Sequence, residues 1–100
     1  MRFGERIKEL RESKKLLQRQ LAASLEIDTP MFSKIERGER RAKREQVLLL
    51  AKLLEADVND LLTIWLAEQV YELVKDEDNA AQALRVAEEE IKYAKSKKSK

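Results

Sequence analysis

Hydrophobic residues in the first part of the chain recur at spacings of three and four, the period of an amphipathic helix. The first series is Phe3, Ile7 and Leu10, and the second is Leu17, Leu21, Ala22 and Leu25. These series predict one helix over residues 3–14 and a second, shorter one over residues 18–25. Because few residues separate the second series from the next one, the connection after it must be tight.

A start signal and a stop signal bracket the next short segment. Asp28 or Thr29 can serve as the N-cap, and Pro30 fits the first turn, where its missing N–H costs nothing. Gly38 can adopt the left-handed conformation that ends many helices. The segment between them therefore reads as a third helix of about two turns, with Phe32 and Ile35 facing inward.

The rest of the chain predicts three further helices. The fourth carries an inward stripe formed by Val47, Leu50, Ala51 and Leu54. Asp57 and Asp60 resemble a capping box at the start of a strongly apolar segment that runs to Val74. The last helix, over residues 79–95, carries Ala80, Leu84, Ala87, Ile91 and Ala94 at alternating spacings of four and three.

Length and composition favour a single all-α domain with an appendage. The chain has 100 residues with only two glycines and one proline, so tight turns are few. We expect a five-helix, repressor-like helix-turn-helix domain over residues 1–66 with an added C-terminal amphipathic helix. The extension spans residues 67–95, and residues 96–100 form a basic flexible tail.

The residue inventory argues against several classes of function. The chain has no cysteine and no histidine, which removes the usual nucleophile, the usual general base and the strongest zinc ligands. We therefore expect no enzyme, no metal site and no cofactor. The start Met1–Arg6 lacks a leader's apolar core, and no apolar run approaches membrane-spanning length, so we expect a soluble, cytoplasmic protein without membrane contact.

Charge is distributed unevenly along the chain. Residues 1–44 hold 13 Lys and Arg against 7 Asp and Glu, a net charge of +6. Residues 45–95 hold 5 against 12, a net charge of −7. A basic front half suggests an anionic partner, whereas ordinary solvated helix faces are the plainer explanation.

Several motifs in the right order resemble one family of regulators. The matching pieces are Gln18–Ala22 (Gln-Arg-Gln-Leu-Ala), Ile35–Gly38 (Ile-Glu-Arg-Gly), Leu50–Leu54 (Leu-Ala-Lys-Leu-Leu) and Leu61–Leu62. Over about residues 3–66 the chain resembles helix-turn-helix regulators of the phage repressor/Cro and xenobiotic-response-element type. This resemblance implies double-stranded DNA as a partner and the third helix as the recognition helix.

The outer face of the third helix suits a DNA groove on physical grounds as well. It carries five residues, none of them acidic: Thr29, Pro30, Ser33, Lys34 and Arg37. The resemblance implies that the first four face base edges. Lys34 is our first candidate, since lysine can donate to guanine O6 and N7; a phosphate contact or a solvated side chain is its alternative.

Further residues are candidates for contacts to the DNA backbone. The resemblance gives Gln18 a phosphate contact and a role in bracing the recognition helix. Basic residues that can neutralise phosphates, or simply be solvated, are Arg19, Arg40, Arg41, Lys43 and Arg44. The resemblance also implies a structural ion pair between Glu36 and Arg11. Glu26 and Glu55 depart from the turn glycine that is common in relatives.

The acidic back half carries more apolar surface than one small globule is expected to cover. Candidates for a homodimer interface are Leu62, Trp65, Leu66, Val70 and Leu73. A two-fold dimer could place two recognition helices one DNA turn apart and read a pseudo-palindrome. The alternatives are that the last helix covers this stripe in a monomer, or that the last helix binds another protein.

The sequence thus predicts a dimeric, sequence-specific transcriptional regulator, a repressor or an activator, that binds an operator through the major groove. Restriction-modification controllers, small phage repressors and antitoxins all fit its size and motif. An alternative of another class is a protein-interaction adaptor that keeps the fold but has lost DNA binding. The operator and the choice between activation and repression are not encoded in any pattern that we can recognise.

Overall fold

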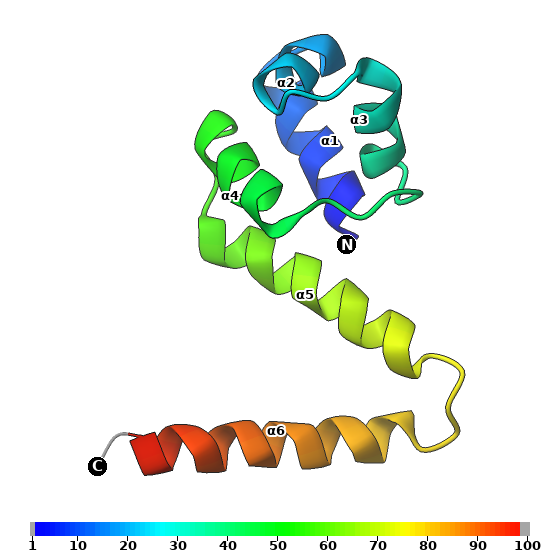
Figure 1. The fold of residues 1–100 in the computed structure, drawn as a ribbon, viewed down its shortest axis with the longest axis vertical. Helices are drawn as coiled ribbons and strands as arrows, with labels where there is room; N and C mark the ends of the chain where they lie inside the picture. The colour runs from blue at the N-terminus through cyan, green and yellow to red at the C-terminus, as the bar shows by residue number, and fades with distance from the viewer. Residues whose placement is uncertain (1, 99–100) are drawn as a thin grey trace. The chain divides into compact units, whose positions relative to one another are not determined.

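The computed structural model describes residues 2–98, and every regular element within them is an α-helix (Figure 1). The helices are α1 (Phe3–Ser13), α2 (Gln18–Ser24), α3 (Thr29–Glu36), α4 (Arg44–Leu53), α5 (Val58–Val74) and α6 (Ala80–Lys98). This confirms the predicted all-α architecture with an added C-terminal helix. The chain divides into two compact units, one up to Gln69 and one from Val70, so α5 begins in the first and ends in the second.

The first unit has one hydrophobic core, to which each of α1 to α5 contributes. The largest fully buried side chains are Phe32, Ile7, Leu50, Leu54, Leu61 and Val47. Helix α3 packs against both α1 and α2 (Figure 1). The residues predicted to face inward on α3 and α4 are buried, whereas Leu17, the first residue of the second series, is 49% exposed. Short helices are stabilised mainly by such packed faces.

Helices α1, α2 and α4 end with the same backbone geometry at a residue that is not glycine. Lys15, Glu26 and Glu55 have φ angles of 56°, 60° and 53°. The next residue in each case donates its N–H back to the helix, at 2.9–3.0 Å, and packs against the core; these residues are Leu16, Ile27 and Ala56. The backbone at Glu26 and Glu55 therefore adopts the left-handed conformation that relatives commonly form with glycine. Glycine would adopt it without the steric cost of a Cβ atom.

Asp28 is the N-cap of α3. Its Oδ1 accepts a hydrogen bond from the backbone N–H of Met31 at 2.7 Å, while Thr29 is the first helical residue. The N–H groups in the first turn of a helix have no carbonyl acceptor within the helix, and the Asp28 carboxylate supplies one. The start of α3 is thus fixed by the sequence immediately before it.

Gly4 allows α1 to lie directly against the end of α3. A Cβ at this position would lie 2.5 Å from the carbonyl oxygen of Ile35 and closer still to that of Glu36. Both are backbone atoms, which cannot move aside as a flexible side chain can. The absence of a side chain at Gly4 therefore sets the distance between these two helices.

Glu68 connects α5 to the start of α1. Its Oε1 accepts a hydrogen bond from the backbone N–H of Phe3 at 2.9 Å and lies 3.4 Å from Nε of Arg2. A carboxylate is favoured at this place because the N-terminus of a helix carries a partial positive charge. This part of α5 is therefore integral to the first unit.

The second unit contains α6, whose side chains are exposed at every position from 81 to 97. The helix runs to Lys98, beyond the predicted end at residue 95 and into the segment expected to be a flexible tail. Lysine is a good helix former and no glycine or proline stops the helix there. Met1, Ser99 and Lys100 lie outside the described residues. Within residues 2–98, none of the helices has the length and apolar character needed to cross a bilayer.

Candidate nucleic-acid interface

Helix α3 turns one face into the core and the other to solvent. Phe32 and Ile35 are buried, with exposed fractions of 0% and 2%. The residues predicted for the outer face are exposed at Thr29, Pro30, Lys34 and Arg37 and half-buried at Ser33. The structure therefore brings all five candidates to the outer side of one short helix.

A buried ion pair attaches the end of α3 to α1. Nε and Nη2 of Arg11 donate to the two carboxylate oxygens of Glu36 at 2.7 and 3.1 Å, and Nη1 donates to the carbonyl of Leu16 at 3.0 Å. The Glu36 side chain is 3% exposed. The hydrogen bond to Glu36 raises the pKa of Arg11 above its ordinary value, outweighing the effect of burial. Two hydrogen bonds between one guanidinium and one carboxylate fix the relative orientation of the two side chains as well as pairing their charges.

Gln18 joins the same network from the first turn of α2. Its Nε2 donates to Oε1 of Glu36 at 2.8 Å. The amide thus connects α2 to the end of α3, across the turn that separates them. Both roles that the resemblance implies for Gln18, bracing of α3 and a phosphate contact, stay predictions.

Arg37 has an acidic neighbour that the sequence analysis did not single out. Its Nε donates to Oε2 of Glu39 at 2.8 Å, and its Nη1 donates to the hydroxyl of Ser33. The hydrogen bond to Glu39 raises the pKa of Arg37, and Arg37 in turn lowers the pKa of Glu39. Both side chains are more than half exposed, at 52% and 55%, so this pair adds little stability but does occupy Arg37.

The connector between α3 and α4, residues 39–43, presents a basic surface. The predicted phosphate-binding side chains Arg19, Arg40, Arg41, Lys43 and Arg44 are all exposed. Among the described residues none of these five forms an ion pair (Arg2, Arg6, Arg11 and Arg37, by contrast, each contact a glutamate). Exposed cations without an ion-pair partner remain available to an anionic partner.

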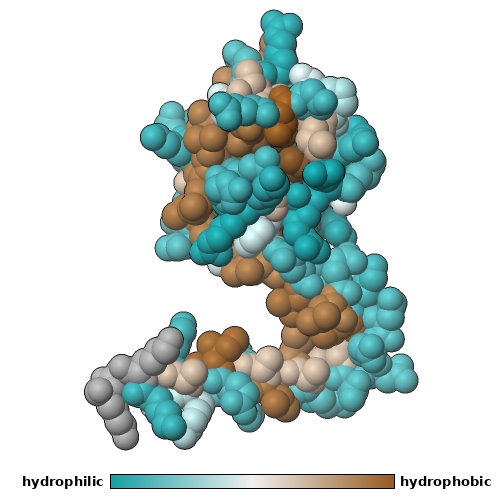
Figure 2. Space-filling view, viewed as in Figure 1, coloured by the Kyte–Doolittle hydropathy of each residue, from teal (hydrophilic) through white to brown (hydrophobic). Residues whose placement is uncertain are grey.

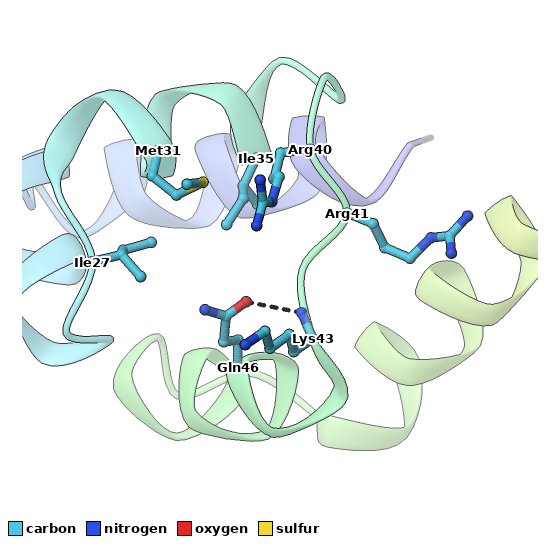
Figure 3. Close-up of a pocket in the computed structure, with 7 residues that line it drawn as sticks. All are labelled: Ile27, Met31, Ile35, Arg40, Arg41, Lys43 and Gln46. Carbon is cyan, nitrogen blue, oxygen red and sulfur yellow. Dashed lines mark hydrogen bonds between the residues drawn. The ribbon is translucent and has the colours of Figure 1, made fainter.

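A small cavity of about 100 Å³ lies between α3, the connector and α4 (Figure 3). Its apolar lining comes from Ile27, Met31 and Ile35, and its polar lining from the connector and Gln46. Figure 3 shows Arg40 and Arg41 pointing in different directions from the connector, with the backbone N–H of Lys43 donating to Oε1 of Gln46 at 2.8 Å. The connector is therefore shaped by its contacts rather than extended freely into solvent.

Trp65, one of the interface candidates, forms a hydrogen bond inside the first unit. Its indole Nε1 donates to the carbonyl oxygen of Ala42 at 2.8 Å. Trp65 and Leu62 are half-buried and pack against the core. The signal for this contact was Ala42 itself, the only apolar residue between Glu39 and Arg44.

The other three interface candidates on α5 are exposed. The exposed fractions are 47% at Leu66, 42% at Val70 and 79% at Leu73. Apolar atoms gather over the surface of α5 in Figure 2. These three residues follow one another at spacings of four and three, so they lie on one face of the helix.

Two short helices joined by a tight turn, the second exposed beside a basic connector, define the helix-turn-helix class of proteins. Residues 2–63, more than half of the chain, match the family described as "Helix-turn-helix domain", and the chain belongs to that family. Such a domain indicates a DNA-binding regulator and is typically non-enzymatic. Neither the curated proteins nor the solved structures yielded a match.

Proposed function

We propose that this chain is a sequence-specific transcriptional regulator of the repressor/Cro and xenobiotic-response-element type, which reads the major groove with α3. One observation carries the proposal: α3 exposes a face without acidic residues, beside basic side chains that have no ion-pair partner among the described residues. A helix of this width fits the major groove, and cations beside it can neutralise phosphates.

Lys34 is the first candidate for reading bases. It is exposed in the middle of the outer face, and its ammonium group can donate to guanine O6 and N7. Thr29 and Pro30 offer apolar contact to a thymine methyl group at the start of the helix. Gln18, Arg19, Arg40, Arg41 and Lys43 would hold the duplex through its phosphates.

Selection of bound sequences from random duplex DNA tests this proposal. We expect one preferred site, and we expect Lys34→Ala to weaken binding to that site by about 1–3 kcal/mol and to relax its sequence preference. Lys52→Ala is the matched control, since it removes the same charge from an exposed position in the last turn of α4. If no sequence is enriched and binding barely depends on salt, the adaptor alternative is favoured instead.

A second copy of the chain is our proposed occupant for the exposed apolar face of α5. Leu66, Val70 and Leu73 supply that face, and Leu62 and Trp65 lie at its edge, partly used by the core. A symmetric dimer would bury these side chains and present two copies of α3 to a pseudo-palindromic site. The exposed apolar residues of α6, such as Leu84 and Ile91, would extend this interface or bind a separate protein partner.

Sedimentation tests the dimer directly. We expect the wild-type chain to sediment as a dimer, and Leu66→Asp and Leu73→Asp to shift it to a monomer, because a buried carboxylate is strongly disfavoured. Tyr71→Asp is the control, as it adds the same charge at an exposed position of α5 that lies 100° or more around the helix from Leu66, Val70 and Leu73. A monomeric wild-type chain would rule out the dimer.

A further inference from the structure

Trp65, the only tryptophan of the chain, makes a specific contact to the backbone of the connector. Its Nε1 lies 2.8 Å from the carbonyl oxygen of Ala42, which is 23 residues earlier in the chain. Ala42 is 2% exposed, so its carbonyl cannot rely on bulk water as a substitute partner. A buried acceptor without a donor is unfavourable, which makes this hydrogen bond a real constraint on the backbone there.

The contact falls in the part of the connector that has few other hydrogen bonds. The N–H groups of Glu39 and Arg40 donate to the carbonyl of Lys34 at one end, and that of Lys43 donates to Gln46 at the other. Between those ends, the bond from Trp65 is the only one recorded to the backbone of residues 41 and 42 within the described part of the chain. The position of Ala42 is therefore set from α5.

We propose that Trp65 is a positioning residue for DNA binding: its indole fixes the connector so that Arg40, Arg41 and Lys43 are held ready for phosphates. This inference rests on the proposed function, which it deepens. Side chains that are held in place before binding lose less conformational freedom when the duplex arrives. Without the indole N–H, the connector would sample other conformations, and part of its charge would no longer meet the DNA backbone.

Trp65→Phe tests this role because it keeps an aromatic ring against the core and removes the indole N–H donor. Binding to a duplex of about 20 bp, enough for two helical turns, is measured by fluorescence anisotropy over a range of salt concentrations. Loss of one phosphate contact would reduce the salt slope by about 0.9, which corresponds to roughly eightfold weaker binding at 0.1 M salt. Ile64→Val is the control, since it trims core packing on α5 and leaves the indole hydrogen bond of Trp65 in place.

A variant that lacks the connector's basic side chains separates a positioning role of Trp65 from an effect on the general stability of the domain. In a chain that already carries Arg40→Ala, Arg41→Ala and Lys43→Ala, Trp65→Phe should cause no further loss of affinity, because the side chains through which it acts are gone. Sedimentation of Trp65→Phe should match the wild type. An unchanged salt slope, or an equal loss of affinity in the triple variant, would overturn the role of Trp65.

One measurement needs no variant and therefore does not depend on Trp65→Phe folding. The emission maximum of the single tryptophan should stay the same as the wild-type chain binds the duplex, because the indole is already bonded to the carbonyl of Ala42 in the free chain. A shift of the emission maximum during binding that anisotropy detects would show that the indole contact forms only with DNA, and it would overturn the inference alone. A wild-type chain that fails to bind any duplex would instead overturn the proposed function.

Discussion

The guanidinium of Arg11 and the carboxylate of Glu36 form a two-point ion pair with N–O distances of 2.7 and 3.1 Å. The pair joins α1 to the end of α3, and Gln18 also contacts Glu36 from α2. The two side chains are 11% and 3% exposed. Because the groups are removed from water, each depends on the other far more than the partners of a surface pair do.

Removing one member of this pair should destabilise the domain more than removing both. Arg11→Met leaves the carboxylate of Glu36 buried with only Gln18 as a partner, and we expect a loss of about 3–5 kcal/mol in the free energy of unfolding. Adding Glu36→Leu to that variant should restore part of the loss. Urea unfolding measures both, and a double variant whose loss equals the sum of the single losses would contradict this interpretation.

Gly4→Ala should separate α1 from α3. The new Cβ would overlap the carbonyl oxygens of Ile35 and Glu36, so we expect a loss of about 3 kcal/mol, the upper end for an overpacked site. Gly38→Ala is the comparison, because the space around Gly38 is open while its φ of 77° strains a side chain. Its cost should be smaller, about 1 kcal/mol. Equal costs in thermal unfolding would mean that the close approach at Gly4 is not decisive.

Glycine at the left-handed turns should stabilise the domain. A residue with a Cβ costs about 1–2 kcal/mol in this conformation, while glycine adds about 0.4–1 kcal/mol of unfolded-state entropy. We therefore expect Glu26→Gly and Glu55→Gly to raise the free energy of unfolding by about 1 kcal/mol each, measured in urea. Glu45→Gly, inside α4, is the contrasting change and should destabilise. Lower stability in the two turn variants would show that their side chains make contacts that matter.

Glu39→Gln should strengthen binding to DNA. Glu39 holds Arg37 and places a negative charge beside the proposed interface. Its removal frees Arg37 for a phosphate, so the salt slope should steepen by about 0.9 in an anisotropy titration. Glu9→Gln, which breaks the exposed contact with Arg6 on α1, should leave the slope unchanged. A weaker affinity for Glu39→Gln would mean that Arg37 needs this partner to be placed correctly.

Affinity for DNA should be nearly constant between about pH 5 and 8, because the chain has no histidine or cysteine to titrate there. Arg37 lowers the pKa of Glu39, mainly through their hydrogen bond, so Glu39 stays ionised down to below its ordinary range. The small contribution of this contact to folding stability is therefore present above the ordinary pKa of a glutamate. It is lost only as the pH falls through the lowered pKa of Glu39. Anisotropy at several pH values checks this, and a clear transition near neutral pH would point to another titrating group.

Local patterns in the sequence were sufficient for the helices and for the candidate reading face. The spacing of Phe32 and Ile35 indicated which side of α3 is buried, and the Asp28–Pro30 signal indicated where it begins. These features depend on residues within one or two turns of each other. For the same reason the motif could be recognised before the fold was known.

What only the tertiary structure decided was which surfaces those helices meet. Trp65 bonds to Ala42 and Glu68 bonds to Phe3, across 23 and 65 residues of chain. Gly4 is significant only because the end of α3 lies against it. Helical periodicity reveals that a face is apolar, but an apolar face can pack against its own domain or against a partner. Only the tertiary structure shows that Trp65 contacts the connector of its own chain.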